Sequence, residues 1–287
     1  TSILPTLSVG FPSYYVGSDL DRRVVPLRVG SIDAFARMLT RSEAYETIAD
    51  RQQVTAILSE EARDLAARSA NPDVLQGMAM QYAALSQMAS GSLETVFSIP
   101  ALHKAHPGIH YGGPFSGPAA VSAAFAVEAM SRNLIRCVSF TSSGFDTHTS
   151  NYRLHPLALQ DLFDLVASLV HTMDKLPPPT RPADKLSDHA HILVLSEFCR
   201  TPQLNQAAGR DHYPNNSALV ISPRFRHPFV FGKSDLDELL PAPIEGFSGG
   251  PRPIAPPDLL ATFVHAFGVD PQKYLRDGEV VKTLLAT

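Results

Sequence analysis

The sequence has few cysteines, no long apolar run and no run of basic residues. Its two cysteines, Cys137 and Cys199, cannot build a disulfide framework, so they leave the redox compartment open. Apolar runs such as residues 163–170 are interrupted by polar residues and are shorter than the roughly 18 residues that span a bilayer, so we expect no membrane span. Without a basic run, and with a net charge of -4, the chain is not expected to bind nucleic acid.

The chain starts at Thr1, without an initiator Met and without the charged and apolar regions of a signal peptide, which is typical of a processed or trimmed product. Its 287 residues lie near the upper size for one hydrophobic core. Hydrophobic residues make up 44% and charged residues 18%, the composition of a soluble globular protein. We predict a single domain over residues 1–287.

The N-terminal part has a helical pattern. Apolar residues recur three and four positions apart over residues 31–90, which predicts about three helices and a helical subregion over 30–95 that serves as scaffold. Residues 100–118 are crowded with Gly, Pro and His, which favours a loop.

Helix and strand patterns alternate from residue 119 onward. Helices are predicted over 119–132, 154–176 and 258–267, and strands over 135–141, 192–195, 218–221 and 228–231. This alternation predicts an α/β fold, with a mainly parallel sheet flanked by helices, in which sites form outside the carboxyl ends of the strands. Residues 110–287 are the part that carries the motifs.

The first motif, Gly144-Phe145-Asp146-Thr147-His148, directly follows a predicted strand. Asp146 and His148 are two residues apart, so in an extended segment they point to the same side and can share one metal ion. A carboxylate oxygen with an imidazole nitrogen suits zinc, manganese or iron better than calcium. The alternative is an Asp that caps a turn beside a hydrogen-bonded His.

The second motif, residues 196–202, places Glu197 and Arg200 just beyond a buried apolar strand, where an unpaired charge is costly. Glu197 is a candidate metal ligand or acid–base group, and Arg200 can bind a phosphate or sulfate with its planar fork of donors. The alternative is an ion pair between the two side chains.

The third motif, Gly209-Arg210-Asp211-His212, has an adjacent Asp and His in a loop, with a second arginine beside them. Alone it is weak, because a surface pair of Arg210 and Asp211 with a bystander His is at least as common. Because three such clusters follow successive predicted strands, together they indicate a site more strongly than any one of them does alone.

Other candidates are better explained as structure. His103, His106 and His110 have the spacing of metal ligands, but Pro107-Gly108 breaks any helix that would align them. Packing or surface roles are expected for His171 and His265, which lie within predicted helices. No base partner for Cys199 as a nucleophile is evident, so we expect a small packing residue there.

The order of the three motifs resembles the bacterial family catalogued as domain of unknown function 1501. That family typically has Gly-Trp-Asp-Thr-His, Glu-Phe-Gly-Arg-Thr-Pro and Gly-Arg-Asp-His-Trp, followed by a late segment similar to Phe267-Gly268-Val269-Asp270-Pro271. The resemblance is clear over about residues 110–285. It departs at Phe145 and Tyr213, which replace tryptophans, at Cys199, which replaces a glycine, and at residues 222–226, where a glycine-rich turn is expected.

The resemblance implies an alkaline-phosphatase-like fold, because the family is placed with the alkaline phosphatase and sulfatase superfamily, and a periplasmic or cell-surface location. It implies a divalent metal, zinc first and otherwise manganese, iron or calcium. The implied activity is hydrolysis of phosphate or sulfate esters, with a small anionic ester or glycan as substrate. The implied metal ligands are Asp146, His148, Glu197, Asp211 and His212. Glu197, Arg200 and Arg210 are the candidate catalytic residues.

Two features favour other functions. The early Gly-Gly-x-Asp-Gly strand of family members is not found here, and their glycine-rich turn is altered at residues 222–226. Separately, neither cysteine lies in the Cys-x-Pro/Ala-x-Arg pattern that a sulfatase needs. The alternative is therefore a catalytically degenerate family member that acts as a structural or binding subunit of an exported or cell-surface assembly. A third possibility is a metal that only stabilises the fold.

Overall fold

The computed structural model describes residues 4–10, 27–39, 93–273 and 275–286, with scattered helical positions between 53 and 68. Two compact units are formed by the chain. Unit 1 comprises residues 1–144 and 157–185, and unit 2 comprises residues 145–156 and 186–287. The single domain over 1–287 stays a prediction. Most of the helical subregion predicted over 30–95, including residues 69–92, lies outside the described residues.

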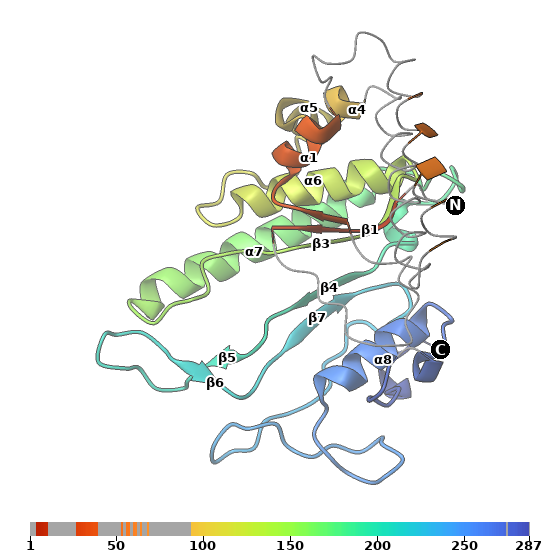
Figure 1. Ribbon diagram of the computed structural model, residues 1–287. Coiled ribbons are helices and arrows are strands. Elements are labelled where there is room, and N and C mark those ends of the chain that lie inside the picture. The colour runs from red at the N-terminus through yellow and green to blue at the C-terminus, as the bar shows by residue number, and fades with distance from the viewer. Residues whose placement is uncertain are drawn as a thin grey trace. The chain divides into compact units, whose positions relative to one another are not determined.

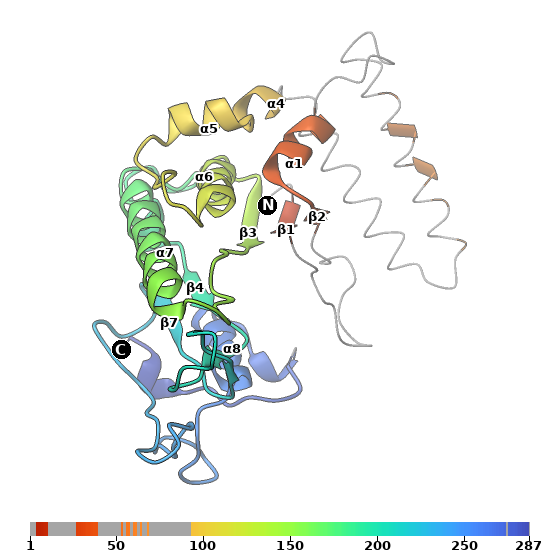
Figure 2. The same cartoon turned by 90° about the vertical axis from the view of Figure 1, so that its left-hand side faces the viewer.

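Unit 1 contains a three-stranded parallel sheet in the order β2-β1-β3. Figure 1 labels β1 and β3, and Figure 2 labels all three strands. The strands are β1 (Leu4–Val9), β2 (Leu27–Val29) and β3 (Ile135–Phe140). Central β1 is paired on both sides, and its Leu7 is fully buried opposite Leu27 and Val138. The α/β prediction is thus confirmed. The sequence predicted β3 but neither β1 nor β2, and β2 has too few residues for a clear period.

The helices of unit 1 pack around this sheet through an aromatic cluster. They include α1 (Ile32–Leu39), α4 (Leu93–Val96), α5 (Ile99–Ala105) and α6 (Gly117–Ser131). Fully buried Phe35, Phe97 and Phe125 contact one another with ring centroids 4.8–6.1 Å apart. Ala-rich α6 lies between α5 and β3 (Figure 2), because its small side chains allow close approach to the sheet.

The prediction of a loop over residues 100–118 is wrong for residues 100–105, which belong to the helix α5. Pro100 is compatible with a helix because it lies in the first turn, where the backbone N–H has no partner within the helix. The Ser98 hydroxyl caps the same end by accepting a hydrogen bond from the Ala101 N–H. Composition alone could not distinguish a proline that starts a helix from one that breaks it.

The three histidines of this region have separate partners. His103 packs on Tyr111, with ring centroids 4.0 Å apart, and buried His106 lies 2.8 Å from the Glu128 carboxylate. His110 lies 2.9 Å from Asp161 on α7 (Asn151–Met173). Each imidazole therefore has a structural role in unit 1.

Asp161 is the most highly connected buried carboxylate described in unit 1. Its oxygens accept hydrogen bonds from the Phe115 N–H, the Ser116 N–H, the Ser116 hydroxyl and His110, at 2.8–2.9 Å. Burial opposes ionisation of the Asp161 carboxyl, but these hydrogen bonds outweigh it and lower the pKa. Asp161 thereby stabilises the start of α6, since it satisfies backbone donors that have no partner within the helix.

We expect Asp161→Ala to lower the free energy of unfolding by about 3 kcal/mol, because several buried donors lose their acceptor. The stabilisation should be complete above the unfolded pKa of about 4 and disappear as pH falls through the lower folded pKa. Chemical denaturation at several pH values measures both effects. The control is Asp164→Ala on the same helix, where only an exposed bond from Gln160 is lost. Equal stability of the two variants would contradict the prediction.

Unit 2 is built on two antiparallel strand pairs, β4 (Ile192–Leu195) with β7 (Ala218–Ile221) and β5 (Cys199–Arg200) with β6 (His212–Tyr213). Helix α8 (Pro256–Ala266) follows later in the chain. Short 3-10 helices span Leu186–Asp188, Pro271–Lys273 and Lys282–Leu284. None of the described helices is both long and apolar enough to cross a membrane.

The prediction that these strands join a mainly parallel sheet is wrong. Between β4 and β7 the chain forms the β5–β6 pair instead of a crossover helix, so it returns antiparallel. The strand predicted over 228–231 is also wrong. Val230 is 91% exposed, and Pro228 has no N–H for a strand ladder.

The end of unit 2 is held by buried Asp258. Its carboxylate accepts two hydrogen bonds from the Arg252 guanidinium at 2.7 and 2.8 Å, and further ones from the Ala255 and Glu279 N–H groups. The Arg252 guanidinium also lies 3.7 Å from the centre of the Phe247 ring. These contacts join the start of α8 to the segment that follows it.

Candidate metal centre

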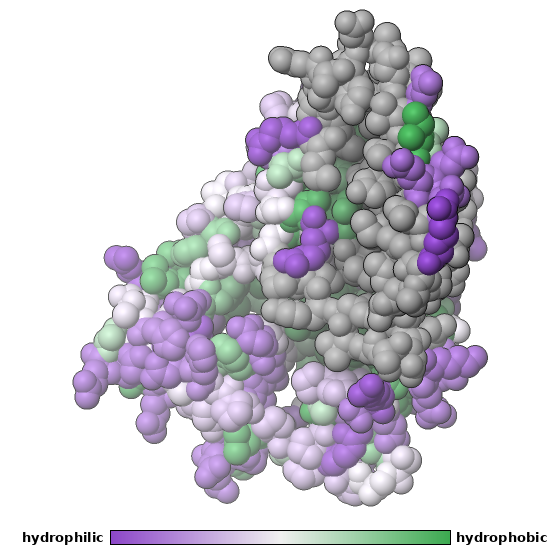
Figure 3. Space-filling model, in the orientation of Figure 1, coloured by the Kyte–Doolittle hydropathy of each residue, from purple (hydrophilic) through white to green (hydrophobic). Residues whose placement is uncertain are grey.

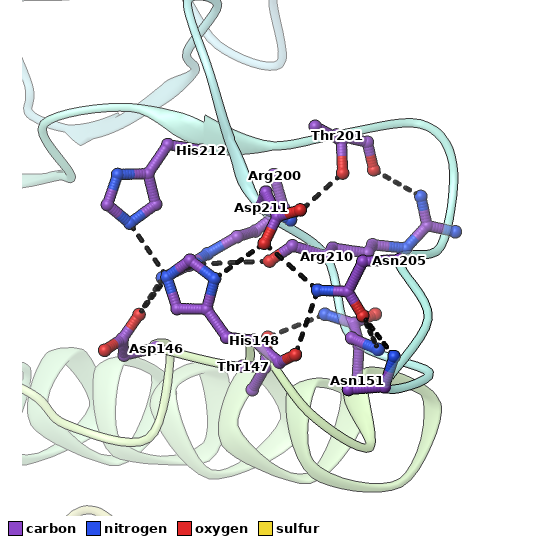
Figure 4. A network of polar contacts seen from close by, with 12 residues as sticks. Asp146, Thr147, His148, Asn151, Arg200, Thr201, Asn205, Arg210, Asp211 and His212 are labelled. Carbon is purple, nitrogen blue, oxygen red and sulfur yellow. Dashed lines mark hydrogen bonds and ion pairs between the residues drawn. The ribbon is translucent and has the colours of Figure 1, made fainter.

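Polar side chains of unit 2 converge where residues 145–150 meet the β5–β6 hairpin (Figure 4). Asp146 and His148 come from the segment before α7, Arg200 from β5, and His212 from β6. The face around β5–β6 is mostly hydrophilic (Figure 3). The structure thus brings the three motifs together although their strands do not form one parallel sheet.

The hairpin loop docks on the segment that carries His148 through backbone hydrogen bonds. The Arg210 N–H donates to the Thr147 carbonyl at 3.0 Å, and the Asn151 N–H donates to the Ala208 carbonyl at 2.9 Å. A Cβ atom on Gly209 would lie 1.9 Å from the His148 carbonyl carbon and oxygen. The loop can approach this closely only because residue 209 is glycine.

Asn205 joins the loop, His148 and Asp211 through its side chain. Its amide nitrogen donates to the His148 carbonyl and to Asp211 Oδ1, both at 3.0 Å. Its amide oxygen accepts from the Ala207 and Gly209 N–H groups at 3.0 and 2.9 Å. Asn205 was not predicted from the sequence, although Asn is typical of turns in which its side chain accepts from the backbone N–H two residues on, as it does here from Ala207.

His148 is the central residue of the cluster. Its Nδ1 lies 2.8 Å from Asp211 Oδ1. Because an ionised carboxylate only accepts hydrogen bonds, Nδ1 donates to Asp211, and in this tautomer Nε2 presents a lone pair. This Nε2 lies 3.1 Å from His212 Nε2 and 3.2 Å from Asp146 Oδ1.

Asp146, His148 and His212 form a group with the geometry of metal ligands. One donor atom from each lies within 4.8 Å of the others. Two donors that are each about 2.1 Å from a tetrahedral ion are about 3.4 Å apart, close to the 3.1 and 3.2 Å observed around His148 Nε2. One oxygen and two nitrogen donors suit zinc, manganese or iron. The residues therefore fit a divalent transition-metal ion.

Both aspartates of the cluster favour their ionised form. A hydrogen bond from Arg200 is the main reason that the pKa of Asp146 is lowered. The pKa of Asp211 is lowered mainly by hydrogen bonds from His148 and Asn205. Asp211 thus orients His148 from its far nitrogen, as outer carboxylates do for metal-bound imidazoles.

Two aromatic contacts support the histidines. The His212 ring stacks on Phe198 with ring centroids 3.9 Å apart. His155, which no sequence motif predicted, lies edge-on to Phe145, and its Nδ1 is 3.4 Å from the buried Thr147 hydroxyl. Burial, followed by the nearby charges of Arg200 and Arg210, lowers the pKa of His155. At neutral pH it is therefore an uncharged neighbour of the centre.

The remaining predicted residues lie in different surroundings. Glu197 is exposed and forms no hydrogen bond or ion pair with the residues that the structure describes. Arg210 donates to the Thr201 and Pro202 carbonyls, and Tyr152 lies under its guanidinium. Its donors thus hold the hairpin loop closed. Arg200, in contrast, reaches into the cluster with a side chain that is only 12% exposed.

Comparison with known proteins finds no curated protein and no solved structure that matches the chain. The model of one family, described as a protein of unknown function (DUF1501), matches residues 17–279. This match spans most of the chain and includes every residue of the candidate centre. The chain therefore belongs to the DUF1501 family, in agreement with the order of its three motifs.

Proposed function

We propose that the protein is a metal-dependent hydrolase of phosphate or sulfate esters. The observation that carries this proposal is the convergence of Asp146 Oδ1, His148 Nε2 and His212 Nε2 beside the guanidinium of Arg200. Three metal donors next to a planar fork of cationic donors suit a substrate that is itself an anion. The substrate class is thus a small anionic ester.

The residues of the chain divide the work between them. Asp146, His148 and His212 would hold the ion, zinc first and otherwise manganese or iron, while Asp211 keeps the His148 lone pair directed at it. A divalent cation held there supplies Lewis-acid chemistry, because it polarises an ester oxygen and makes water more acidic. Arg200 would bind the anionic oxygens of the substrate. Because the Arg210 donors already bond to backbone carbonyls, we assign anion binding to Arg200.

The motif order further supports an alkaline-phosphatase-like relationship and a periplasmic or cell-surface location, which we propose with the activity. Glu197 lies two residues after the end of β4, and we propose it as an additional ligand or acid–base group. A Glu197→Gln variant is informative here, since it preserves the size of the side chain and removes only the charge.

Elemental analysis of the purified protein, combined with an ester screen, tests the proposal. We expect about one equivalent of zinc, manganese or iron for the one described ligand group. Hydrolysis of phosphate or sulfate esters should stop on chelation and return when the ion is added back, while the melting temperature reports whether the fold survives.

Other outcomes point to the alternatives. A protein that holds no stoichiometric metal and hydrolyses none of the esters would refute the proposal and favour a structural or binding subunit. A chelator that lowers the melting temperature of a protein without any activity would indicate a metal that only stabilises the fold.

A further inference from the structure

Arg200 uses the same acceptor atoms that a metal ion would need. Its Nη2 donates to Asp146 Oδ1 at 2.7 Å, and its Nη1 lies 3.2 Å from His148 Nε2. Since His148 Nδ1 carries the ring proton, Nε2 is the acceptor in this contact. The positively charged guanidinium therefore contacts the same two atoms, Asp146 Oδ1 and His148 Nε2, that would bind the metal ion.

A metal ion and this arrangement of Arg200 exclude each other. The single lone pair of His148 Nε2 can either accept a hydrogen bond or bind an ion. Two positive charges at such short range also repel strongly in a partly buried setting. Entry of an ion must therefore displace the guanidinium from His148 Nε2, and the repulsion weakens its bond to Asp146.

Other contacts would keep the displaced Arg200 beside the centre. Its Nη1 also donates to the Arg210 carbonyl at 3.2 Å, and its guanidinium lies 5.6 Å from the centre of the Phe198 ring. Neither group belongs to the metal-ligand group. The Arg200 side chain is only 12% exposed, so surrounding atoms limit its movement. Its freed donors would therefore remain next to the ion.

We propose that Arg200 is an internal cation that exchanges with the metal ion and, once displaced, completes a binding site for an oxyanion such as sulfate or phosphate. Metal and anion then bind cooperatively, because the anion separates two positive charges that would otherwise repel. This inference rests on the proposed function and adds the order of assembly: the anion site of Arg200 forms only after the ion has bound.

The first test compares zinc affinity by titration calorimetry in wild type, Arg200→Leu and Arg200→Lys. Leucine removes the competing cation, so Arg200→Leu should bind zinc about tenfold tighter or more. Lysine keeps the charge but has one ammonium in place of a fork, so its affinity should lie in between. Arg153→Leu, which removes an exposed arginine of unit 2, controls for net charge and should match wild type.

The second test measures inorganic sulfate affinity with and without zinc in wild type and Arg200→Leu. Without zinc the two proteins should bind sulfate equally weakly, because Asp146 neutralises the Arg200 guanidinium and His148 helps to hold it in place. With zinc, wild type should bind sulfate about tenfold tighter than Arg200→Leu. Direct attraction between zinc and sulfate is the same in both proteins, so the difference in sulfate affinity between them reports on Arg200 alone.

Several outcomes would overturn the inference. Zinc affinity that is unchanged or weaker in Arg200→Leu would mean that Arg200 does not compete with the ion. An equal loss of sulfate affinity with and without zinc would mean that the arginine is available to anions from the start. Either result leaves the metal site and the proposed function standing. A wild-type protein that bound none of zinc, manganese and iron would refute both.

Discussion

Replacing His148 by alanine is expected to remove stoichiometric metal and to lower ester hydrolysis by at least about a thousandfold. His148 Nε2 lies within 3.2 Å of donor atoms on both Asp146 and His212, so its loss removes the centre of the ligand group. Metal content by elemental analysis and kcat/KM on the best ester measure the effect. An unchanged melting temperature of the metal-free proteins would show that the fold is preserved.

Asp211→Asn is the matched comparison for His148→Ala. Asp211 contacts Nδ1 of His148, and it is not part of the group whose donor atoms meet. We therefore expect a metal that still binds, about 10 to 100-fold more weakly, as for other outer carboxylates. If Asp211→Asn lost the metal as completely as His148→Ala, Asp211 would itself be a ligand, the role implied by the family resemblance.

Replacing Gly209 by alanine should destabilise unit 2 by about 2–4 kcal/mol and weaken metal binding. The added Cβ would lie 1.9 Å from the His148 carbonyl group and 2.4 Å from the Thr149 nitrogen, and both are backbone atoms. The loop must then move away, which increases the distance of Asp211 and His212 from His148. Denaturant unfolding and zinc titration report the two effects separately.

Gly249→Ala is the control for this substitution, since no atom lies within 4 Å of a Cβ built there. It should leave zinc affinity unchanged. A Gly209→Ala protein that matched this control in stability and in zinc affinity would show that docking of the hairpin loop is not needed for the centre.

Local patterns predicted the chemistry of the centre better than its architecture. Two residues apart in an extended segment, Asp146 and His148 were expected to point to one side, and the structure places their donor atoms 3.2 Å apart. Helices α6, α7 and α8 and strands β3, β4 and β7 were also predicted, within a few residues at their ends. Each of these features depends on neighbours in the chain, so a period or a spacing is sufficient to find it.

Features that depend on distant partners were not predictable in this way. The antiparallel pairing of β4 with β7 is set by the route of the chain between them. Asn205 is an ordinary turn residue until the His148 carbonyl and Asp211 lie beside it. The apolar residues 228–231 resemble a strand, but no described strand pairs with them.

The sequence by itself determined the family, the α/β class and the residue types that can hold a metal ion, because these are properties of composition, period and motif order. Only the tertiary structure decided which residues meet. It placed Asp146, His148 and His212 around one point, Asp211 behind His148, and the Arg210 donors on backbone carbonyls. The physical reason is that a ligand set depends on the positions and lone pairs of atoms far apart in the chain, which close backbone contacts such as that of Gly209 bring into register.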